Sequence, residues 1–254
     1  MNIVVCAKQV VDVSEIKVDS STKKPILSGV PQKISDIDKN ALEEAIRIKE
    51  KHGGKITVVT VGPSDAKERI KELLAMGADE GVLVVPPQNA DYSVVSHILA
   101  GAIKKIGGYD IVLCGEASID MFSGQMGPRV AGLLNIPQIT YAQNVVVEKD
   151  KVVSERNLGD KAVTIESPYP VLITVTKEIN QPRLPSLMQI LASSSKPIHK
   201  WSASDVASGK LEPKIKTVDI KGVPMVRKNV IFHDDLDQCV NKLVDELAKV
   251  GVLR

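Results

Sequence analysis

YDIVLCGEASIDMFSGQMGPRVAGLLNIP, residues 109–137, is the stretch of sequence that decides the fold. Its apolar run at 111–114 is too short for a helix and predicts a buried parallel strand, which Gly115 ends. A polar loop follows at 116–123, and residues 124–134 then carry glycines, a proline and apolar residues at helical spacing. The stretch therefore predicts a strand, a loop and a helix in succession.

This order predicts a site for an anion at the start of the helix. The first amides of a helix have no partner within it, and the helix dipole adds partial positive charge there. Glycine allows a phosphate to approach the backbone, and Pro128 costs nothing where an amide would be unpaired anyway. The spacing matches neither the P-loop nor the dinucleotide fingerprint. The alternative is a plain turn in which Gly124 and Gly127 serve only tight packing.

The alternation of strand and helix patterns extends from the N-terminus to residue 135. Apolar strand runs occur at 2–7, 56–61, 82–85 and 111–114, and a helical pattern follows each of them. This predicts an α/β protein with a mostly parallel, doubly wound sheet. Ligands of such sheets bind beyond the carboxyl ends of the strands, at the point where strand order reverses. We expect the strand ends at Ala7–Lys8, Val61–Gly62, Pro86 and Cys114–Gly115 to meet at one pocket.

After Pro137 the pattern changes. Short β-rich runs at 144–148, 151–156, 162–166 and 171–176 have short connections, which predicts antiparallel strands that extend one edge of the sheet. A proline-rich loop at 177–197 contains a short apolar helix that Ser186 can cap. An irregular segment and a final amphipathic helix at 234–250 follow. We expect a domain at 1–198, and a C-terminal arm and helix at 199–254 that pack on a partner subunit.

Composition excludes several classes of protein. With 43% hydrophobic and 3% aromatic residues, the chain has a full aliphatic core, and its net charge of +2 predicts no nucleic-acid partner and no membrane insertion. No apolar run reaches membrane-spanning length, and we expect no signal peptide before the first strand. Three cysteines without CxxC spacing favour a reduced, cytoplasmic protein. The sequence contains no HExxH or GxSxG motif, so we predict neither a metal site nor catalytic residues.

The loop after Gly115 resembles the signature loop of the electron transfer flavoprotein β subunit family, whose pattern is roughly G-x-Q-A-x-D-x-D-x-x-Q-x-G-P. Residues 115, 120, 125, 127 and 128 match this pattern without a gap, and the likeness extends from residue 3 to about 198. Two departures stand out: Ala117 and Ser118 replace Gln-Ala, and Phe122 replaces the second acidic residue. The resemblance implies a fold of the adenine-nucleotide α-hydrolase-like type.

The resemblance also implies which residues contact a nucleotide. The contacts fall at the first and second strand ends, before the first helix and in the signature loop: Cys6, Ser35, Asp36, Ile37, Asp38, Val61, Gly115, Asp120, Phe122, Ser123, Gly124, Gln125, Met126 and Gly127. Asp38 is either a binding carboxylate or a helix cap. Asp120 could contact a ribose, but we expect it to hold the amides of its own loop. Leu187 and Arg183 match the leucine and arginine of the family's recognition loop, which docks on partner dehydrogenases.

The implied function is that of an electron carrier subunit. The resemblance implies a heterodimer with an α subunit that holds most of a shared FAD, while the β chain binds AMP or a second FAD. Electrons would pass from flavin-dependent dehydrogenases, or from NADH in an electron-bifurcating member, to a quinone-reducing or ferredoxin-type acceptor. The choice between AMP and FAD stays open, with the hydroxyl of Ser123 favouring FAD. The alternative is a stand-alone adenine-nucleotide sensor like the universal stress proteins.

Overall fold

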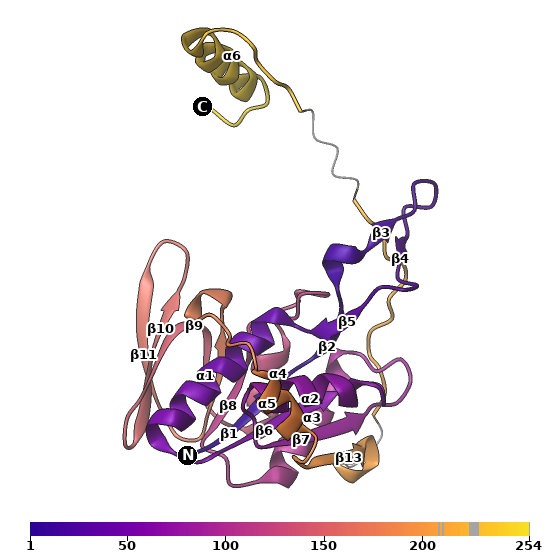
Figure 1. Ribbon diagram of the computed structural model, residues 1–254, viewed down its shortest axis with the longest axis vertical. Helices are drawn as coiled ribbons and strands as arrows, with labels where there is room; N and C mark the ends of the chain where they lie inside the picture. The colour runs from indigo at the N-terminus through magenta and orange to yellow at the C-terminus, as the bar shows by residue number, and fades with distance from the viewer. Residues whose placement is uncertain (208, 210, 224–228, 254) are drawn as a thin grey trace. The chain divides into compact units, whose positions relative to one another are not determined.

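The computed structural model describes residues 1–207, 209, 211–223 and 229–253. Within them the chain forms two compact units, residues 1–17 with 26–220, and residues 18–25 with 221–254. The first unit is built on a sheet that has nine strands among the described residues, in the order β11-β10-β9-β12-β8-β1-β6-β7-β13 (Figure 1). The strands are β1 Asn2–Cys6, β6 Lys55–Val61, β7 Glu80–Val85, β8 Ile111–Gly115, β9 Gln138–Val147, β10 Lys151–Asn157, β11 Ala162–Pro168, β12 Val171–Val175 and β13 Ile198–Ser202.

The helices lie on both faces of this sheet, which confirms the doubly wound α/β fold. They are α1 Asp36–His52, α2 Ala66–Met76, α3 Tyr92–Ile106, α4 Met126–Leu134 and α5 Leu187–Ser193, with α6 Leu236–Lys249 in the second unit. Successive side chains of a strand point to opposite faces, so β1 serves two cores. Ile3 and Val5 pack with α1 and α2, whereas Val4 and Cys6 pack with α3 and α4.

The order of the parallel strands reverses at β1. From β1 the chain passes through α1 to β6 and β7 on one side, and then returns through α3 to β8 on the other side of β1. The carboxyl ends of β1 and β8 therefore form the switch point, where ligands of open parallel sheets bind.

Two strands differ from the sequence-based prediction. The run at 171–176, expected to be antiparallel, is β12, which pairs in parallel with β8 and β9. All five of its residues are buried, as is typical of a central parallel strand. The antiparallel extension itself is confirmed by β9, β10 and β11. Strand β13 pairs in parallel with β7. Residues 198–220 therefore belong to the same compact unit as the sheet, although we assigned most of them to the C-terminal arm.

Smaller elements complete the fold. Between β1 and α1, β2 Gln9–Val11 pairs with β5 Gln32–Ile34, and β3 Lys17–Val18 with β4 Pro25–Ile26. The part of the chain that the structure describes also has three single-turn 3-10 helices, η1 Val13–Glu15, η2 Lys177–Ile179 and η3 Ala203–Asp205. In the second unit, Gly222 donates a backbone hydrogen bond to Lys23, and α6 carries an exposed apolar stripe that includes Leu236, Val240 and Leu243.

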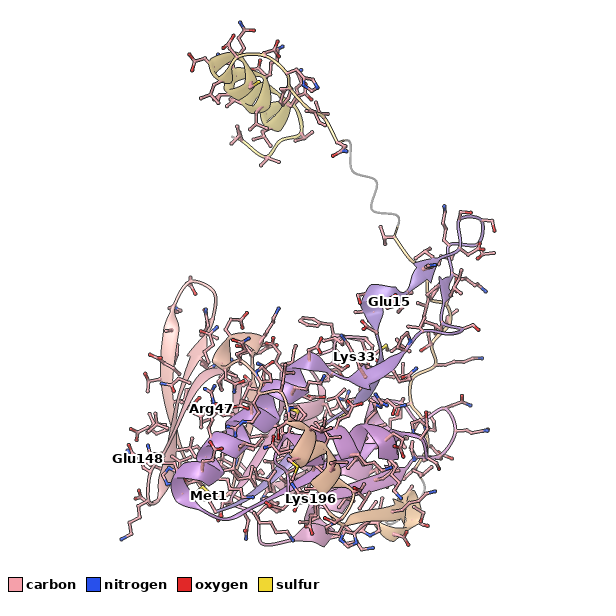
Figure 2. The ribbon with its side chains drawn as sticks, viewed as in Figure 1. Met1, Glu15, Lys33, Arg47, Glu148 and Lys196 are labelled. Atoms are coloured by element: carbon pink, nitrogen blue, oxygen red, sulfur yellow. The ribbon has the colours of Figure 1, made fainter. Side chains whose placement is uncertain are left out.

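The proline-rich loop at 177–197, called the recognition loop here after the family loop that it resembles, is bound to the domain on both sides of α5, while α5 itself presents apolar side chains to solvent. Arg183 bonds Glu43 and Glu50 of α1, and Nζ of Lys196, labelled in Figure 2, lies 2.8 and 2.6 Å from the carbonyl oxygens of Leu74 and Ala78. The predicted cap at Ser186 is confirmed as a capping box with Gln189. The side chain of Leu187 is 72% exposed. The apolar side chains of Met188, Ile190 and Leu191 on the same helix are also exposed.

Candidate functional site

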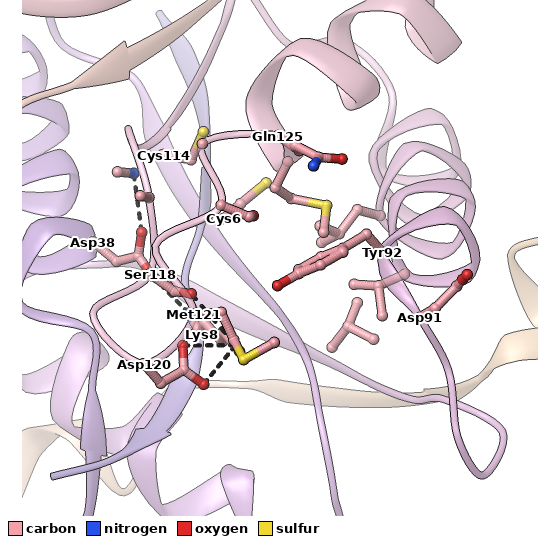
Figure 3. A pocket seen from close by; sticks show the side chains of 18 of the residues that line it. Cys6, Lys8, Asp38, Asp91, Tyr92, Cys114, Ser118, Asp120, Met121 and Gln125 are labelled. Carbon is pink, nitrogen blue, oxygen red and sulfur yellow. Dashed lines mark hydrogen bonds and ion pairs between the residues drawn. The ribbon is translucent and has the colours of Figure 1, made fainter. Parts of the chain in front are cut away.

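A pocket of about 390 Å³ opens at the switch point (Figure 3). Its floor comes from the ends of β1, β6 and β8, its sides from the loop after β8 and the N-termini of α3 and α4, and part of its rim from residues 215 and 217. Three of the four strand ends that we expected to converge do so. The end of β7 at Pro86 does not line the pocket, but Ala90, Asp91 and Tyr92, which follow it, do.

The side chain of Asp38 joins the two strands that flank the switch point. Its Oδ2 accepts a hydrogen bond from the backbone nitrogen of Lys8 at 2.9 Å, and its Oδ1 accepts one from that of Gly115 at 2.9 Å. Burial raises the pKa of this carboxyl to about 7, although the two backbone hydrogen bonds oppose the shift. Asp38 is therefore a clamp between β1 and β8, not the helix cap that we considered.

A second link across the switch point is an ion pair. Nζ of Lys8 lies 2.8 and 2.7 Å from the two carboxylate oxygens of Asp120, as the dashed lines in Figure 3 show. Burial raises the pKa of Asp120, but the hydrogen bonds from Lys8 and Ser118 outweigh it and lower the pKa overall. Asp120 thus ties its loop chiefly to the lysine after β1, a partner that the sequence analysis did not identify.

The loop after β8 leads into α4, and no side chain at the N-cap position caps the N-terminus of this helix. Gln125 stands at the N-cap position but its side chain makes no capping bond, and the bond from Arg129 N to Gln125 O, at 3.1 Å, is the first of the helix. The amides of Met126 and Gly127 precede that bond, so the helix does not satisfy them. Met126 and Gln125 line the pocket. This is the geometry that the sequence predicted for an anion.

Gly127 has a different role from the one that its place in the signature loop suggested. A Cβ built on it would lie 2.3 Å from Cγ2 of Thr174 in β12 and 3.3 Å from Sγ of Cys114 in β8. Its missing side chain thus faces the sheet and allows α4 to approach the strands. A valine at 127 would disturb this packing before it could obstruct a phosphate.

The opposite wall of the pocket comes from α3 and from a later segment of the chain. Asp91 caps α3 by accepting a hydrogen bond from Val94 N at 2.9 Å, and Tyr92 directs its ring toward the pocket (Figure 3). Ile215 and Thr217 add to the rim. Further along this wall, Val95 and Leu99 of α3 present apolar surface together with Val61 of β6.

The structure brings together most of the residues that we predicted to contact a nucleotide. Those that line the pocket are Cys6, Asp38, Val61, Gly115, Asp120, Ser123, Gly124, Gln125 and Met126. Those that do not are Ser35, Asp36, Ile37, Phe122 and Gly127. Asp36 is instead exposed and pairs with Lys33, and Ser35 accepts a hydrogen bond from Ile119 N at 3.4 Å without capping α1.

Several lining residues lay outside the predicted set. The positions of Lys8 and Asp91 in the sequence could have identified them. Lys8 follows the first predicted strand, and Asp91 stands at the start of the helix after the third predicted strand, so both fall at the predicted binding edge of the sheet. Tyr92 follows Asp91 and could have been identified in the same way. Ile215 and Thr217 could not, because no pattern in an irregular segment predicts which surface it crosses.

The residues present fit an adenine nucleotide. The volume lies within the range of about 300–1,000 Å³ that is usual for small-molecule sites, and the lining includes the start of α4 as well as the apolar residues Val61, Val95 and Leu99. Three of the four acidic residues in the pocket are already bound: Asp38 by two amides, Asp120 by Lys8 and Asp91 by amides. An incoming phosphate therefore does not face these carboxylates unpaired.

The described residues contain no group of three or more side chains placed to hold a metal ion. None of the described helices combines the length and hydrophobicity that crossing a bilayer requires.

Comparisons with known proteins agree on one family. A family model described as the electron transfer flavoprotein domain matches residues 22–206. The chain is 43% identical to the electron transfer flavoprotein subunit beta of Thermoanaerobacterium thermosaccharolyticum over 261 aligned residues, which cover all of both chains. It is 42% identical to the protein of the same name from Clostridium acetobutylicum, over 81% of this chain and 80% of that one. It is also 39% identical to the caffeyl-CoA reductase-Etf complex subunit CarD of Acetobacterium woodii, over 81% of this chain and 80% of that one.

Proposed function

The chain belongs to the electron transfer flavoprotein family as a β subunit, and from this premise we propose that it binds an adenine nucleotide in the switch-point pocket and pairs with an α subunit that carries a shared FAD. The observation that carries the proposal is the open N-terminus of α4 at the rim of a pocket in the expected place. In this proposal the protein moves electrons between partner proteins and forms no covalent bond with a substrate.

Residues at two ends of the pocket would hold the nucleotide. The amide of Met126, with the hydroxyl of Ser123, would take the phosphate. Val61, Val95 and Leu99 would pack against the base, since they form the apolar side of the pocket. The floor would hold its shape through the Asp38 clamp and the Lys8–Asp120 pair. A flavin, where one is bound, supplies the electron-transfer chemistry, and the chain supplies binding, orientation and exclusion of water.

Two surfaces support binding to other proteins. The apolar stripe of α6 is uncovered, and we propose that the α subunit packs on it, with residues 221–254 as the reaching arm. The recognition loop exposes Leu187 on a helix whose ends are fixed, which supports its proposed role as an anchor for a flavin-dependent dehydrogenase or an electron acceptor. Arg183 would act indirectly, because its guanidinium is bound to Glu43 and Glu50.

Counting released cofactors tests this proposal. The full chain is co-expressed with its α subunit, the complex is denatured, and FAD and AMP are quantified per heterodimer. One FAD with one AMP supports an ordinary member, and two FAD support a bifurcating member. The similarity to a subunit of a caffeyl-CoA reductase complex keeps the second result in consideration. A complex with one FAD and no second nucleotide would contradict the proposed pocket.

The alternative function, a stand-alone nucleotide sensor, is disfavoured because the family match at residues 22–206 includes the recognition loop. A colourless homodimer that binds ATP and forms no complex with an α subunit would restore it. We keep the cytoplasm as the proposed location, because a reducing compartment suits free cysteines such as Cys6 and Cys114.

A further inference from the structure

We propose that residues 211–217, here called the strap, close one side of the nucleotide pocket, and that Asp91 is the positioning residue that holds the strap there. The inference rests on the proposed function, because it assumes that the pocket takes a nucleotide. It goes beyond that function by assigning a role to a segment outside the signature loop.

The chain before the strap is fitted closely to α3. A Cβ on Gly101 would lie only 1.8 Å from the carbonyl oxygen of Val206, so the backbone of this segment lies directly against the helix. Nζ of Lys105 lies 4.5 Å from the ring centroid of Trp201, in β13. Leu211, the first residue of the strap, packs against the same core as α3. The strap therefore starts from a fixed point on α3 and leads toward the N-terminus of that helix.

Asp91 holds the strap with one carboxylate oxygen and caps α3 with the other. Its Oδ1 accepts the hydrogen bond from Val94 N, while its Oδ2 lies 2.7 Å from Lys214 N and 3.0 Å from Ile215 N. Burial raises the pKa of Asp91, but these backbone hydrogen bonds outweigh burial and lower it, so the charged form is favoured. A helix cap alone needs only one of these oxygens.

The strap reaches the pocket directly after this attachment. Ile215 and Thr217 stand on the rim, in a pocket whose other sides are the signature loop and the start of α4. A nucleotide held by α4 would thus also touch the strap. Binding and closure are then linked: a ligand that contacts the strap only when it is closed binds the closed state more tightly and increases its population.

Amide hydrogen exchange on the full-length, nucleotide-free chain tests the inference without any substitution. AMP and FAD are added separately, and exchange of the Lys214 and Ile215 amides is followed by mass spectrometry. We expect the bound nucleotide to slow their exchange at least tenfold. Trypsin gives a second readout, because AMP should protect the chain from cleavage at Lys214 and Lys216.

Two substitutions of Asp91 separate the strap from the helix cap. Asparagine and serine both cap helices well. In Asp91→Ser the side chain is too short to reach the strap. In Asp91→Asn the side chain keeps a single acceptor oxygen, which cannot bind both the α3 amide and the strap amides. We expect each variant to bind AMP about tenfold more weakly and to lose the AMP-dependent protection at Lys214. Asp235→Asn, which alters the cap of α6 in the same way, is the matched control and should bind AMP like the wild type.

The outcomes distinguish this inference from the proposed function. If the wild type binds AMP or FAD but the strap amides exchange at the same rate with and without nucleotide, the strap inference fails and the pocket stands. If both Asp91 variants bind AMP with wild-type affinity, the strap inference likewise fails and the pocket stands. If the wild type binds neither nucleotide, both proposals fail.

Discussion

The backbone nitrogen of Gly115 lies 2.9 Å from Oδ1 of Asp38, and a Cβ at position 115 would lie 2.8 Å from that same oxygen. The first distance makes the hydrogen bond that joins β8 to α1. The second explains why the strand must end in glycine, since any larger residue would push away the carboxylate that also holds β1. The geometry of the switch point therefore depends on this pair.

Replacing Gly115 by alanine should open the switch point. The new Cβ would also lie 3.0 Å from Cγ2 of Ile37, so α1 would have to shift, and we expect a loss of about 1–3 kcal/mol in the free energy of unfolding. Nucleotide content should fall with it. Gly132→Ala is the control, because its Cβ would meet nothing within 4 Å in α4 and alanine favours a helix. Urea denaturation measures both variants, and equal stability in the two would contradict the clamp.

The buried carboxyl of Asp38 should give the stability a distinctive pH dependence. Its pKa is about 7 in the folded chain, against 3.8 as the ordinary value. Between these values the folded chain keeps a proton that the unfolded chain has released. The protonated Asp38 therefore contributes its full stabilisation below pH 3.8, and this stabilisation is lost as the pH rises through the folded pKa of about 7. The loss is at most about 1.4 kcal/mol per pH unit.

Urea titrations of the wild type and Asp38→Asn between pH 5 and 8 check this prediction. The variant is expected to lose less stability than the wild type as the pH rises, because its amide does not titrate. Other groups contribute equally to both curves, so their difference isolates Asp38. Parallel curves would show that Asp38 ionises in the folded chain at an ordinary pKa.

The strand ends at the switch point could be predicted because they depend on local patterns. Apolar runs ended by glycine or polar residues placed β1, β6 and β8, and a helix start with glycines placed α4. Parallel topology then brings Cys6, Val61 and Gly115 to one edge, whatever the details of the loops.

What could not be predicted depends on contacts between distant segments. The signature loop assigned Gly127 to the ligand, but the direction of its missing side chain depends on how closely α4 packs on Thr174. The partner of Asp120 is more than a hundred residues away, at Lys8. Strand β13 alternates only weakly and pairs at an edge, so few of its residues need to be apolar.

Asp120→Asn should weaken nucleotide binding with little effect on stability. Its ion pair with Lys8 is partly exposed, at 20% and 41% of the two side chains, so we expect less than about 1 kcal/mol of stability from it. The pair nevertheless holds the signature loop against β1, and AMP affinity measured by calorimetry should fall about three- to tenfold. Asp36→Asn is the matched control, because Asp36 pairs with Lys33 outside the pocket. If only the control lost affinity, the pocket would be misplaced.

Arg183→Ala should loosen the recognition loop. Burial raises the pKa of Glu43, but its hydrogen bonds with Arg183 outweigh this and lower it, so the pair stabilises the fold above the usual pKa of a glutamate and less as pH falls through the folded value. Arg183 is one-third exposed and Glu43 keeps a bond to Arg47, so we expect a loss of only about 1–2 kcal/mol at neutral pH. Lys71→Ala, at an exposed pair with Glu68, should change stability by less than about 0.5 kcal/mol in the same denaturation assay. Equal losses in both variants would contradict the role of Arg183.

Leu187→Ala should impair electron delivery while leaving the subunit intact. The side chain is largely exposed, so removing it should change the free energy of unfolding by less than about 0.5 kcal/mol, and flavin content should stay the same. If Leu187 enters an apolar pocket of a partner, its burial contributes about 1.5–3 kcal/mol to binding, and the rate at limiting partner concentration should fall at least about tenfold. Leu158→Ala, another exposed leucine that follows β10, should transfer electrons at the wild-type rate. Because the two truncations are chemically identical, a rate that falls only at 187 locates the docking surface on α5, and unchanged rates in both would remove the anchor from the proposal.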